Sequence, residues 1–254
     1  MVRRWVPPIL LLAALIGAWQ VAASSGALAS ALNLDPILVP SPAEVASSLW
    51  ENRSLLAENT WVTLKEVLLG FLCALAAGLA FAVLLHLSGL LQRATYPLLV
   101  ASQTIPVLVL APILVVWFGY GLGPKLAIVA LICFFPITVN TFDGLRSVDP
   151  EAIKTMRTLY ASRLQILRRV EGPSALPFAF SGAKIGATIA VIGAVFGEWV
   201  GAEPRIGGLG VLIREDNANL QTARLFAATA ILAALGVALF GLLSLAERRI
   251  VTWR

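Results

Sequence analysis

Six runs of mostly apolar residues constrain what this chain can fold into more than any other feature. They cover residues 6–24, 62–87, 94–118, 125–142, 176–200 and 225–246, and about 17 to 25 such residues make one helical membrane crossing. The chain is 59% hydrophobic and 13% charged, with a mean hydropathy of +0.87. A soluble domain cannot bury that much apolar surface. Because β-type alternation is absent, we predict an all-α membrane protein of about six transmembrane helices, with residues 1–254 as one domain.

The first run resembles a secretory signal, because it follows a basic tip and precedes small residues. It is also about long enough to cross a bilayer by itself. Since several further spans follow it, we expect it to stay as an uncleaved first span.

The distribution of Lys and Arg predicts the orientation. With the N-terminus inside, the inside connections hold 12 of these residues and the outside ones 6. The inside set is Arg3, Arg4, Arg93, Arg146, Lys154, Arg157, Arg163, Arg168, Arg169, Arg248, Arg249 and Arg254, and the outside set is Arg53, Lys65, Lys125, Arg205, Arg214 and Arg224. This bias predicts that both termini are cytoplasmic. The net charge of +5 therefore reflects topology, and nucleic acid is excluded as a partner.

The third and fourth spans contain prolines, at Pro106, Pro112 and Pro136. Proline removes a backbone hydrogen bond and kinks a helix. The polar residues beside these prolines include Gln103, Thr104 and Asn140. Two interpretations stay open: ordinary kinks with packed polar groups, or a broken element whose polar groups line a translocation pathway.

The fifth span combines a glycine face with two charges. Gly182, Gly186, Gly193 and Gly197 fall on one side of the helix, where small residues allow close helix packing. The packing partner, in this chain or a second copy, stays open. The two charges are Lys184, expected to snorkel toward the inner end, and Glu198, which either lines a pathway or anchors a neighbour.

Catalytic motifs are missing from the sequence. It contains no GxxxxGK[ST] phosphate loop, no HExxH and no GxSxG, and Cys73 and Cys133 lie in apolar runs as small core residues do. We therefore predict no catalytic residue, no metal and no cofactor in this chain. A self-sufficient channel or secondary transporter, a membrane subunit driven by a separate motor, and a membrane anchor remain as classes.

Residues 149–173 form a basic segment, here called the elbow, that predicts two short helices. Asp149 and Pro150 are a helix start, Ser162 with Gln165 is a capping box, and Gly172–Pro173 is a stop signal. Two capped helices with an apolar face suit a protein groove better than a lipid surface. The candidate docking residues are Asp149, Glu151, Lys154, Leu159, Tyr160, Ala161, Ser162, Arg163 and Arg168.

The elbow resembles the cytoplasmic signature of binding-protein-dependent ABC import permeases. In that signature an E-A-A triplet is followed by a glycine and then by I-x-L-P. In this chain the triplet falls on Lys154, Thr155 and Met156, the glycine on Tyr160 and the tetrad on residues 170–173. The proline, the Ala161–Ser162 step and the overall spacing match the signature. Most other positions of the signature hold different residues here. Three longer segments resemble the nitrate/sulfonate/taurine group of these permeases, most closely its thiamine-precursor pyrimidine branch. These segments are PLLVASQTIPVLVLAPILVVWFGYG, CFFPITVNTFDGLRSVDPE and AVIGAVFGEWVGAE.

This resemblance, over about residues 36–250, implies a type I ABC importer permease in a bacterial inner membrane. It implies a homodimer, two cytoplasmic ATPase subunits that dock at the elbow and carry ATP and Mg, and an extracytoplasmic binding protein that delivers a small solute. A pyrimidine thiamine precursor is the favoured solute; riboflavin-like compounds, sulfonate, taurine and nitrate stay open. A self-sufficient secondary transporter is the rival from another class.

Overall fold

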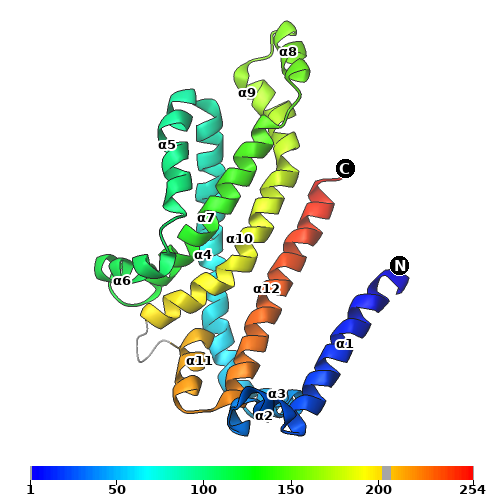
Figure 1. Ribbon diagram of the computed structural model, residues 1–254. Coiled ribbons are helices and arrows are strands. Elements are labelled where there is room, and N and C mark those ends of the chain that lie inside the picture. The colour runs from blue at the N-terminus through cyan, green and yellow to red at the C-terminus, as the bar shows by residue number, and fades with distance from the viewer. Residues whose placement is uncertain (1, 202–206, 254) are drawn as a thin grey trace.

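The computed structural model describes residues 2–201 and 207–253, and these residues fold into helices and connecting turns without a strand (Figure 1). Among them, five helices are long and apolar enough to cross a membrane, or six if a bent pair counts as one span. The spanning elements are α1 (Val2–Ser24), α4 (Arg53–Leu87), the pair α5 (Gly89–Ser102) and α6 (Val107–Phe118), α7 (Leu122–Arg146), α10 (Gly172–Val200) and α12 (Thr222–Ile250). The prediction of an all-helical, multi-span protein is confirmed.

Short elements occupy the two ends of this bundle. One end, the elbow end, carries α8 (Pro150–Thr158), α9 (Arg163–Ile166) and the π turn η2 (Leu167–Glu171). The opposite end, the α11 end, carries α2 (Ala27–Leu32), η1 (Pro36–Leu38), α3 (Pro42–Glu51) and α11 (Leu209–Ala218). Figure 1 shows that α1 runs toward the α11 end and that α12 runs from the α11 end back toward the elbow side. Helix α11 begins after residues 202–206, which with Arg205 lie outside the described part.

The third span, predicted over residues 94–118, is a broken element, which is one of the two interpretations left open for its prolines. The helices α5 and α6 meet at an angle of 104°, across a break that ends at Pro106. Pro106 has an extended backbone, with φ −61° and ψ 122°. A proline lacks the N–H that would continue the helix and disfavours helical geometry in the residue before it. Together these effects break the helix at this point.

The core lies where α7 packs against α4 and α10. It contains Val129 and Ile137 of α7 and Ala187 and Ala190 of α10, all 1% exposed or less. The four glycines of α10 face α7. A methyl group at Gly182 would lie 2.5 Å from the Pro136 carbonyl oxygen, and one at the other three would lie 3.1–3.3 Å from Ile137, Val129 or Lys125. The glycine face therefore packs within the same chain and brings two spans into backbone contact.

The elbow begins its two helices at the predicted caps. The Glu151 N–H donates to Asp149 Oδ1 at 2.9 Å, and Ser162 and Gln165 form the reciprocal capping box. The predicted stop at Gly172–Pro173 is wrong, because the helix continues from α9 through η2 into α10. In the π turn the Gly172 N–H donates to the Leu167 carbonyl, five residues back. This wider turn lets the helix run on past Pro173, which has no N–H to donate.

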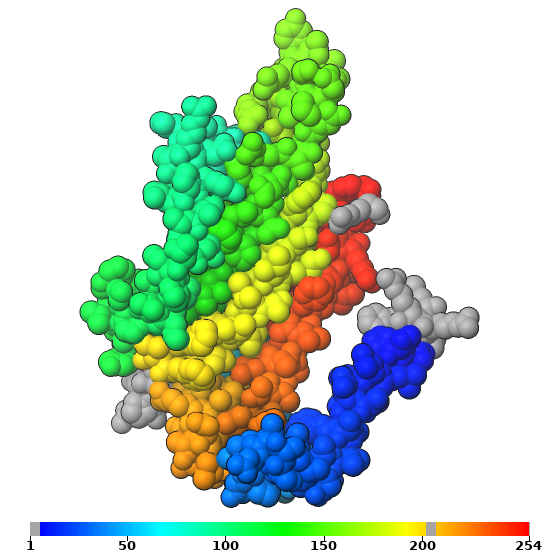
Figure 2. All heavy atoms as spheres, in the orientation of Figure 1, coloured from blue at the N-terminus to red at the C-terminus, as the bar shows by residue number. Residues whose placement is uncertain are grey.

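Helix α1 stands apart from the bundle. The helical turns that follow Val6 are apolar and exposed: Ile9 is 60% exposed and Leu10 is 64% exposed. Figure 2 shows that the gap between α1 and α12 stays open when all heavy atoms are drawn. Only near its end does α1 approach α12, where the rings of Trp19 and Phe226 lie 6.0 Å apart. Most of its apolar surface therefore needs lipid or another chain to cover it.

Candidate functional site

A cavity of about 540 Å³ lies at the break between α5 and α6. Its walls come from the break itself, from α7 and from α10. The lining residues are Ser102, Gln103, Ile105, Pro106, Val107, Leu131, Ile132, Phe135, Pro136, Val139, Asn140, Ile185 and Ile189. None of these described residues is charged. The cavity is therefore apolar with a few neutral polar groups, which is the usual make-up of a small-molecule site.

Gln103 and Asn140, 37 positions apart in the sequence, both line this cavity. The Asn140 side-chain amide donates to the Pro136 carbonyl at 2.8 Å, which leaves its own carbonyl oxygen available. Within the described residues the Gln103 side chain has no hydrogen-bond partner and is exposed. Each carboxamide offers both a donor and an acceptor. The cavity thus presents complementary groups to a neutral, hydrogen-bonding solute.

Thr104, the third polar residue predicted here, does not line the cavity. Its hydroxyl donates to the Ala101 carbonyl at 2.8 Å, and its N–H bonds the same carbonyl at 3.0 Å. Ala101 lies in the last turn of α5, whose carbonyls have lost their helical partners. Thr104 therefore caps the C-terminal end of α5.

Glu198 lies in a different place, buried between α10, α4 and the start of α11. The Thr63 hydroxyl donates to its Oε1 at 2.6 Å, and the Gly210 N–H donates to its Oε2. Thr63 accepts the Leu209 N–H at 2.9 Å, and Asn59 accepts the Gly208 N–H at 2.7 Å. We call Asn59, Thr63 and Glu198 the clamp. Of the two roles weighed for Glu198, this geometry is that of an anchor, because the carboxylate binds N–H groups that a helix start leaves unpaired.

A buried ion pair beside the clamp was missed by the sequence reasoning. Lys125 Nζ of α7 lies 2.8 Å from Glu66 Oε1 of α4, with side-chain exposures of 0% and 1%. In the sequence alone Lys125 counts as an outside charge, and Glu66 lies within a predicted span. An acid and a base in neighbouring spans are a usable signal for such a pair. The pair joins α4 to α7 where the Gly197 face of α10 also meets Lys125.

Lys184, expected to snorkel toward the inner end, forms an ion pair with the last turns of α12. Its Nζ lies 2.8 Å from Glu247 Oε2 on α12, and it sits over the ring of Phe240 at 5.8 Å from the centroid. Because a charge in an apolar setting needs a partner, this pair ties α10 to α12.

The elbow is joined to α4 by a second cluster that the sequence reasoning missed. Glu171 is 1% exposed; its Oε2 lies 2.9 Å from His86 Nε2, and its Oε1 accepts from Arg163 Nη1 at 3.3 Å. Arg163 Nη2 also donates to the His86 carbonyl at 3.3 Å. This joint, made of His86, Arg163 and Glu171, fixes the start of α10 against the end of α4. Arg163 therefore serves the elbow's attachment.

The other predicted elbow residues face outward or cap helices. Asp149 and Ser162 are caps, and Lys154 pairs with Glu151 at 2.6 Å on the surface. Ala161 is half-buried, and Arg168 is exposed. Leu159 and Tyr160 are 71% and 96% exposed. The elbow thus presents an apolar tip surrounded by basic groups, which its own fold does not cover.

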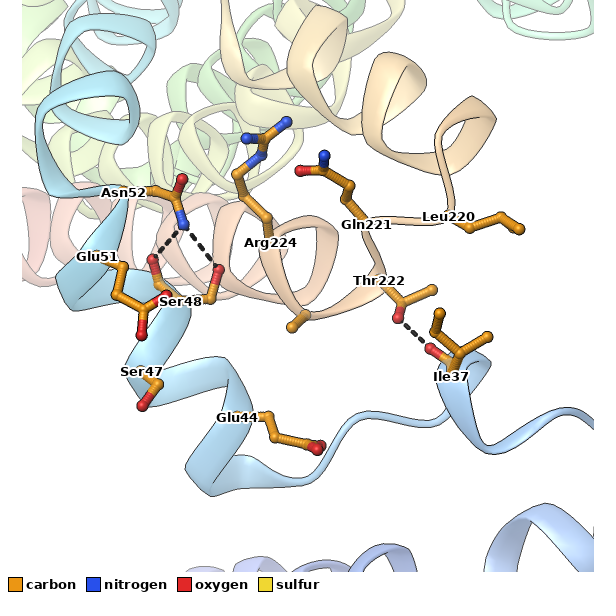
Figure 3. Close-up of a pocket in the computed structure, with 11 residues that line it drawn as sticks. Ile37, Glu44, Ser47, Ser48, Glu51, Asn52, Leu220, Gln221, Thr222 and Arg224 are labelled. Carbon is orange, nitrogen blue, oxygen red and sulfur yellow. Dashed lines mark hydrogen bonds between the residues drawn. The ribbon is translucent and has the colours of Figure 1, made fainter.

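A groove of about 380 Å³ lies at the α11 end, between η1, α3 and the turn from α11 to α12 (Figure 3). Several of its polar groups have partners in this chain. Asn52 donates to the Ser48 carbonyl and hydroxyl, Thr222 donates to the Ile37 carbonyl, and Arg224 pairs with the buried Asp216. The last two of these contacts tie η1 and α11 to α12.

Residues 67–252 match the family described as the binding-protein-dependent transport system inner membrane component. A probable ABC transporter permease of Haemophilus influenzae is 38% identical over 93% of this chain and 93% of its own length. The formylaminopyrimidine transport permease ThiX of Halalkalibacterium halodurans is 38% identical over 86% and 87%. The riboflavin permease RibX of Chloroflexus aurantiacus is 39% identical over 85% and 80%.

A more distant relative, the putative aliphatic sulfonates permease SsuC of Bacillus subtilis, is 29% identical over 98% of this chain and 88% of its own length. Among solved structures, a chain of the MetNI methionine ABC transporter in an inward-facing conformation matches with a TM-score of 0.63 and 25% identity. The match covers 80% of this chain and 97% of that one.

Proposed function

Because this chain belongs to the binding-protein-dependent transport system inner membrane component family, we propose that it forms the membrane path for a small neutral heterocycle, with a pyrimidine thiamine precursor favoured. The chain is an ABC importer permease subunit and a multi-pass inner-membrane protein. It is not an enzyme, and ATP hydrolysis belongs to a separate subunit. The observation that carries the substrate proposal is the uncharged cavity at the broken span.

The chemistry of this cavity favours a neutral solute over an anion. Moving a charge out of water without a partner costs far more than moving a hydrogen-bonded neutral group. The described lining has no Lys or Arg to receive sulfonate, taurine or nitrate, whereas Gln103 and Asn140 match the ring nitrogens and amino groups of a pyrimidine. Phe135 adds an aromatic wall. Riboflavin-like compounds share this chemistry and are the second choice.

We propose the usual partners of such a permease for this chain. A second copy would complete the membrane path, two ATPase subunits would bind ATP and Mg and dock at the elbow in the cytoplasm, and a binding protein would deliver the solute from the other side. The elbow suits this role because α8 has no buried residue and its tip is apolar and basic.

The proposed motion follows from how the elbow is attached. ATP binding would draw the two motors together and carry the elbows with them. The joint of His86, Arg163 and Glu171 links each elbow to α4, and η2 continues directly into α10. A rigid lever on two spans can convert motor closure into alternating access. The clamp and the Lys125–Glu66 pair would hold the far ends of the same spans.

Transport by the purified complex tests this proposal. The chain is purified in mild detergent with its ATPase and binding protein and reconstituted into vesicles, and uptake of formylaminopyrimidine, riboflavin and taurine is compared. We expect ATP-dependent uptake of the pyrimidine. Replacing both Gln103 and Asn140 with Leu should lower it about tenfold or more, since two hydrogen-bonding partners are lost.

Thr104→Val is the matched control, because Thr104 lies outside the cavity; it should keep most uptake. Efficient taurine uptake that survives the double substitution would refute the substrate class. Uptake that is independent of ATP would refute the permease assignment for this complex.

A further inference from the structure

Tyr160, at the tip of the elbow, has a backbone conformation that favours glycine. Its φ is +56°, in the left-handed region that side chains with a Cβ rarely adopt. The helix α8 ends here in a Schellman motif: the Tyr160 N–H bonds the Arg157 carbonyl at 3.0 Å, and the Ala161 N–H bonds the Met156 carbonyl at 3.0 Å. Such a motif needs a left-handed residue at this position and does not need an aromatic ring.

The ring also contributes nothing to this chain's own fold. Tyr160 is 96% exposed, and Leu159 beside it is 71% exposed. Among the described residues, the Tyr160 ring has no ring contact and its hydroxyl has no hydrogen bond. Backbone strain that a fold does not use is a pointer to function, so the partner of this ring must come from outside the chain.

The surroundings of Tyr160 indicate a protein partner. Helix α8 has nine residues, none of them buried, and an isolated helix of that length is marginal in water. Figure 1 places α8 at the far end of the molecule's long dimension, beyond the ends of the spans. Lys154 and Arg157 of α8 precede the tip and are exposed. An exposed aromatic ring beside an arginine is the composition of an interface hot spot.

We infer that Tyr160 is a specificity-determining knob that inserts into an aromatic-sized, acid-rimmed pocket of the ATP-hydrolysing subunit. The inference rests on the proposed function, since it needs that subunit to dock at the elbow. It goes further by assigning the contact to one side chain, whose strained backbone is retained for binding. Its distinctive consequence is that replacing Tyr160 with Gly weakens docking without weakening the permease itself.

Four variants of the full chain test this. The ATP-hydrolysing subunit recovered with the wild-type chain from its own membranes is produced separately and titrated onto each purified permease. Tyr160→Gly and Tyr160→Asn, which both tolerate the left-handed backbone, should weaken binding about tenfold or more. Tyr160→Phe keeps the ring and should bind within about threefold of wild type. The unfolding temperature of Tyr160→Gly should equal or exceed that of wild type.

Leu220→Gly is the matched control, because Leu220 is also left-handed, with φ +57°, and exposed, but lies at the α11 end. It should leave the affinity unchanged. Full affinity of Tyr160→Gly for the subunit would overturn the inference while leaving the proposed docking intact. Unchanged subunit affinity combined with lost binding to phosphatidylglycerol vesicles would overturn it in favour of a lipid contact. Failure to recover any ATP-hydrolysing subunit with the wild-type chain would overturn both proposals.

Discussion

The two ends of the molecule contain the same ion pair, a lysine with a glutamate, in opposite settings. Near the α11 end, Lys125 and Glu66 are 2.8 Å apart and have side-chain exposures of 0% and 1%. At the elbow, Lys154 and Glu151 are 2.6 Å apart and have side-chain exposures of 70% and 73%. Distance alone would rank the elbow pair as the stronger. Burial reverses the ranking, because water screens the exposed pair and not the buried one.

The difference in burial matches a difference in what surrounds each pair. The clamp beside Lys125 satisfies the first N–H groups of α11 with side chains of α4 and α10. The elbow exposes its apolar tip, continues into α10 and is tied to α4 at the joint. The α11 end is thus a closed frame held by internal hydrogen bonds. The elbow end acts as a lever whose exposed surface is available to a partner.

Breaking the buried pair should have the largest effect. Lys125→Met keeps the aliphatic stem but leaves Glu66 buried without its cation, which costs about 3–5 kcal/mol in the free energy of unfolding. Thermal unfolding of the permease in detergent measures the loss. A double variant, Lys125→Met with Glu66→Met, should recover much of it, since two apolar groups replace two charges. If the single variant were as stable as wild type, the buried pair would not contribute to the stability of the fold.

Removing the clamp hydroxyl should have an intermediate effect. Thr63→Val preserves the side chain's shape but removes the donor to Glu198 and the acceptor for the Leu209 N–H. An unpaired buried polar group costs about 1–3 kcal/mol. Hydrogen exchange of the α11 amides should accelerate while that of α8 stays unchanged. Slow exchange of α11 in this variant would show that the clamp does not hold it.

Removing the exposed pair should have the smallest effect. Lys154→Met matches the Lys125 substitution in chemistry but acts on a pair that contributes about 0.2–0.5 kcal/mol. Its unfolding temperature should be within error of wild type. If Lys154→Met lowered the free energy of unfolding as much as Lys125→Met does, the two ends would not differ in the way proposed.

The elements that follow local rules were the predictable part. Asp149 with Pro150, and Ser162 with Gln165, start helices where their sequence places them, because a cap acts within three residues. The prolines of the third span left a kink and a break both open, and the structure has a break at Pro106. The predicted stop at Gly172–Pro173 is wrong, because a π turn carries the helix through it. Local signals do not distinguish between these outcomes.

The sequence by itself determined that this chain is a helical membrane protein with a capped basic elbow, since hydropathy, helix length and capping are properties of short segments. Only the tertiary structure decided which polar groups meet. Thr63 reaches Glu198 across 135 positions, and Lys125 reaches Glu66 across 59. Gln103 and Asn140 come to share one cavity. Such meetings depend on how each helix is rotated and placed against its neighbours, and that is set by close packing along the glycine face of α10.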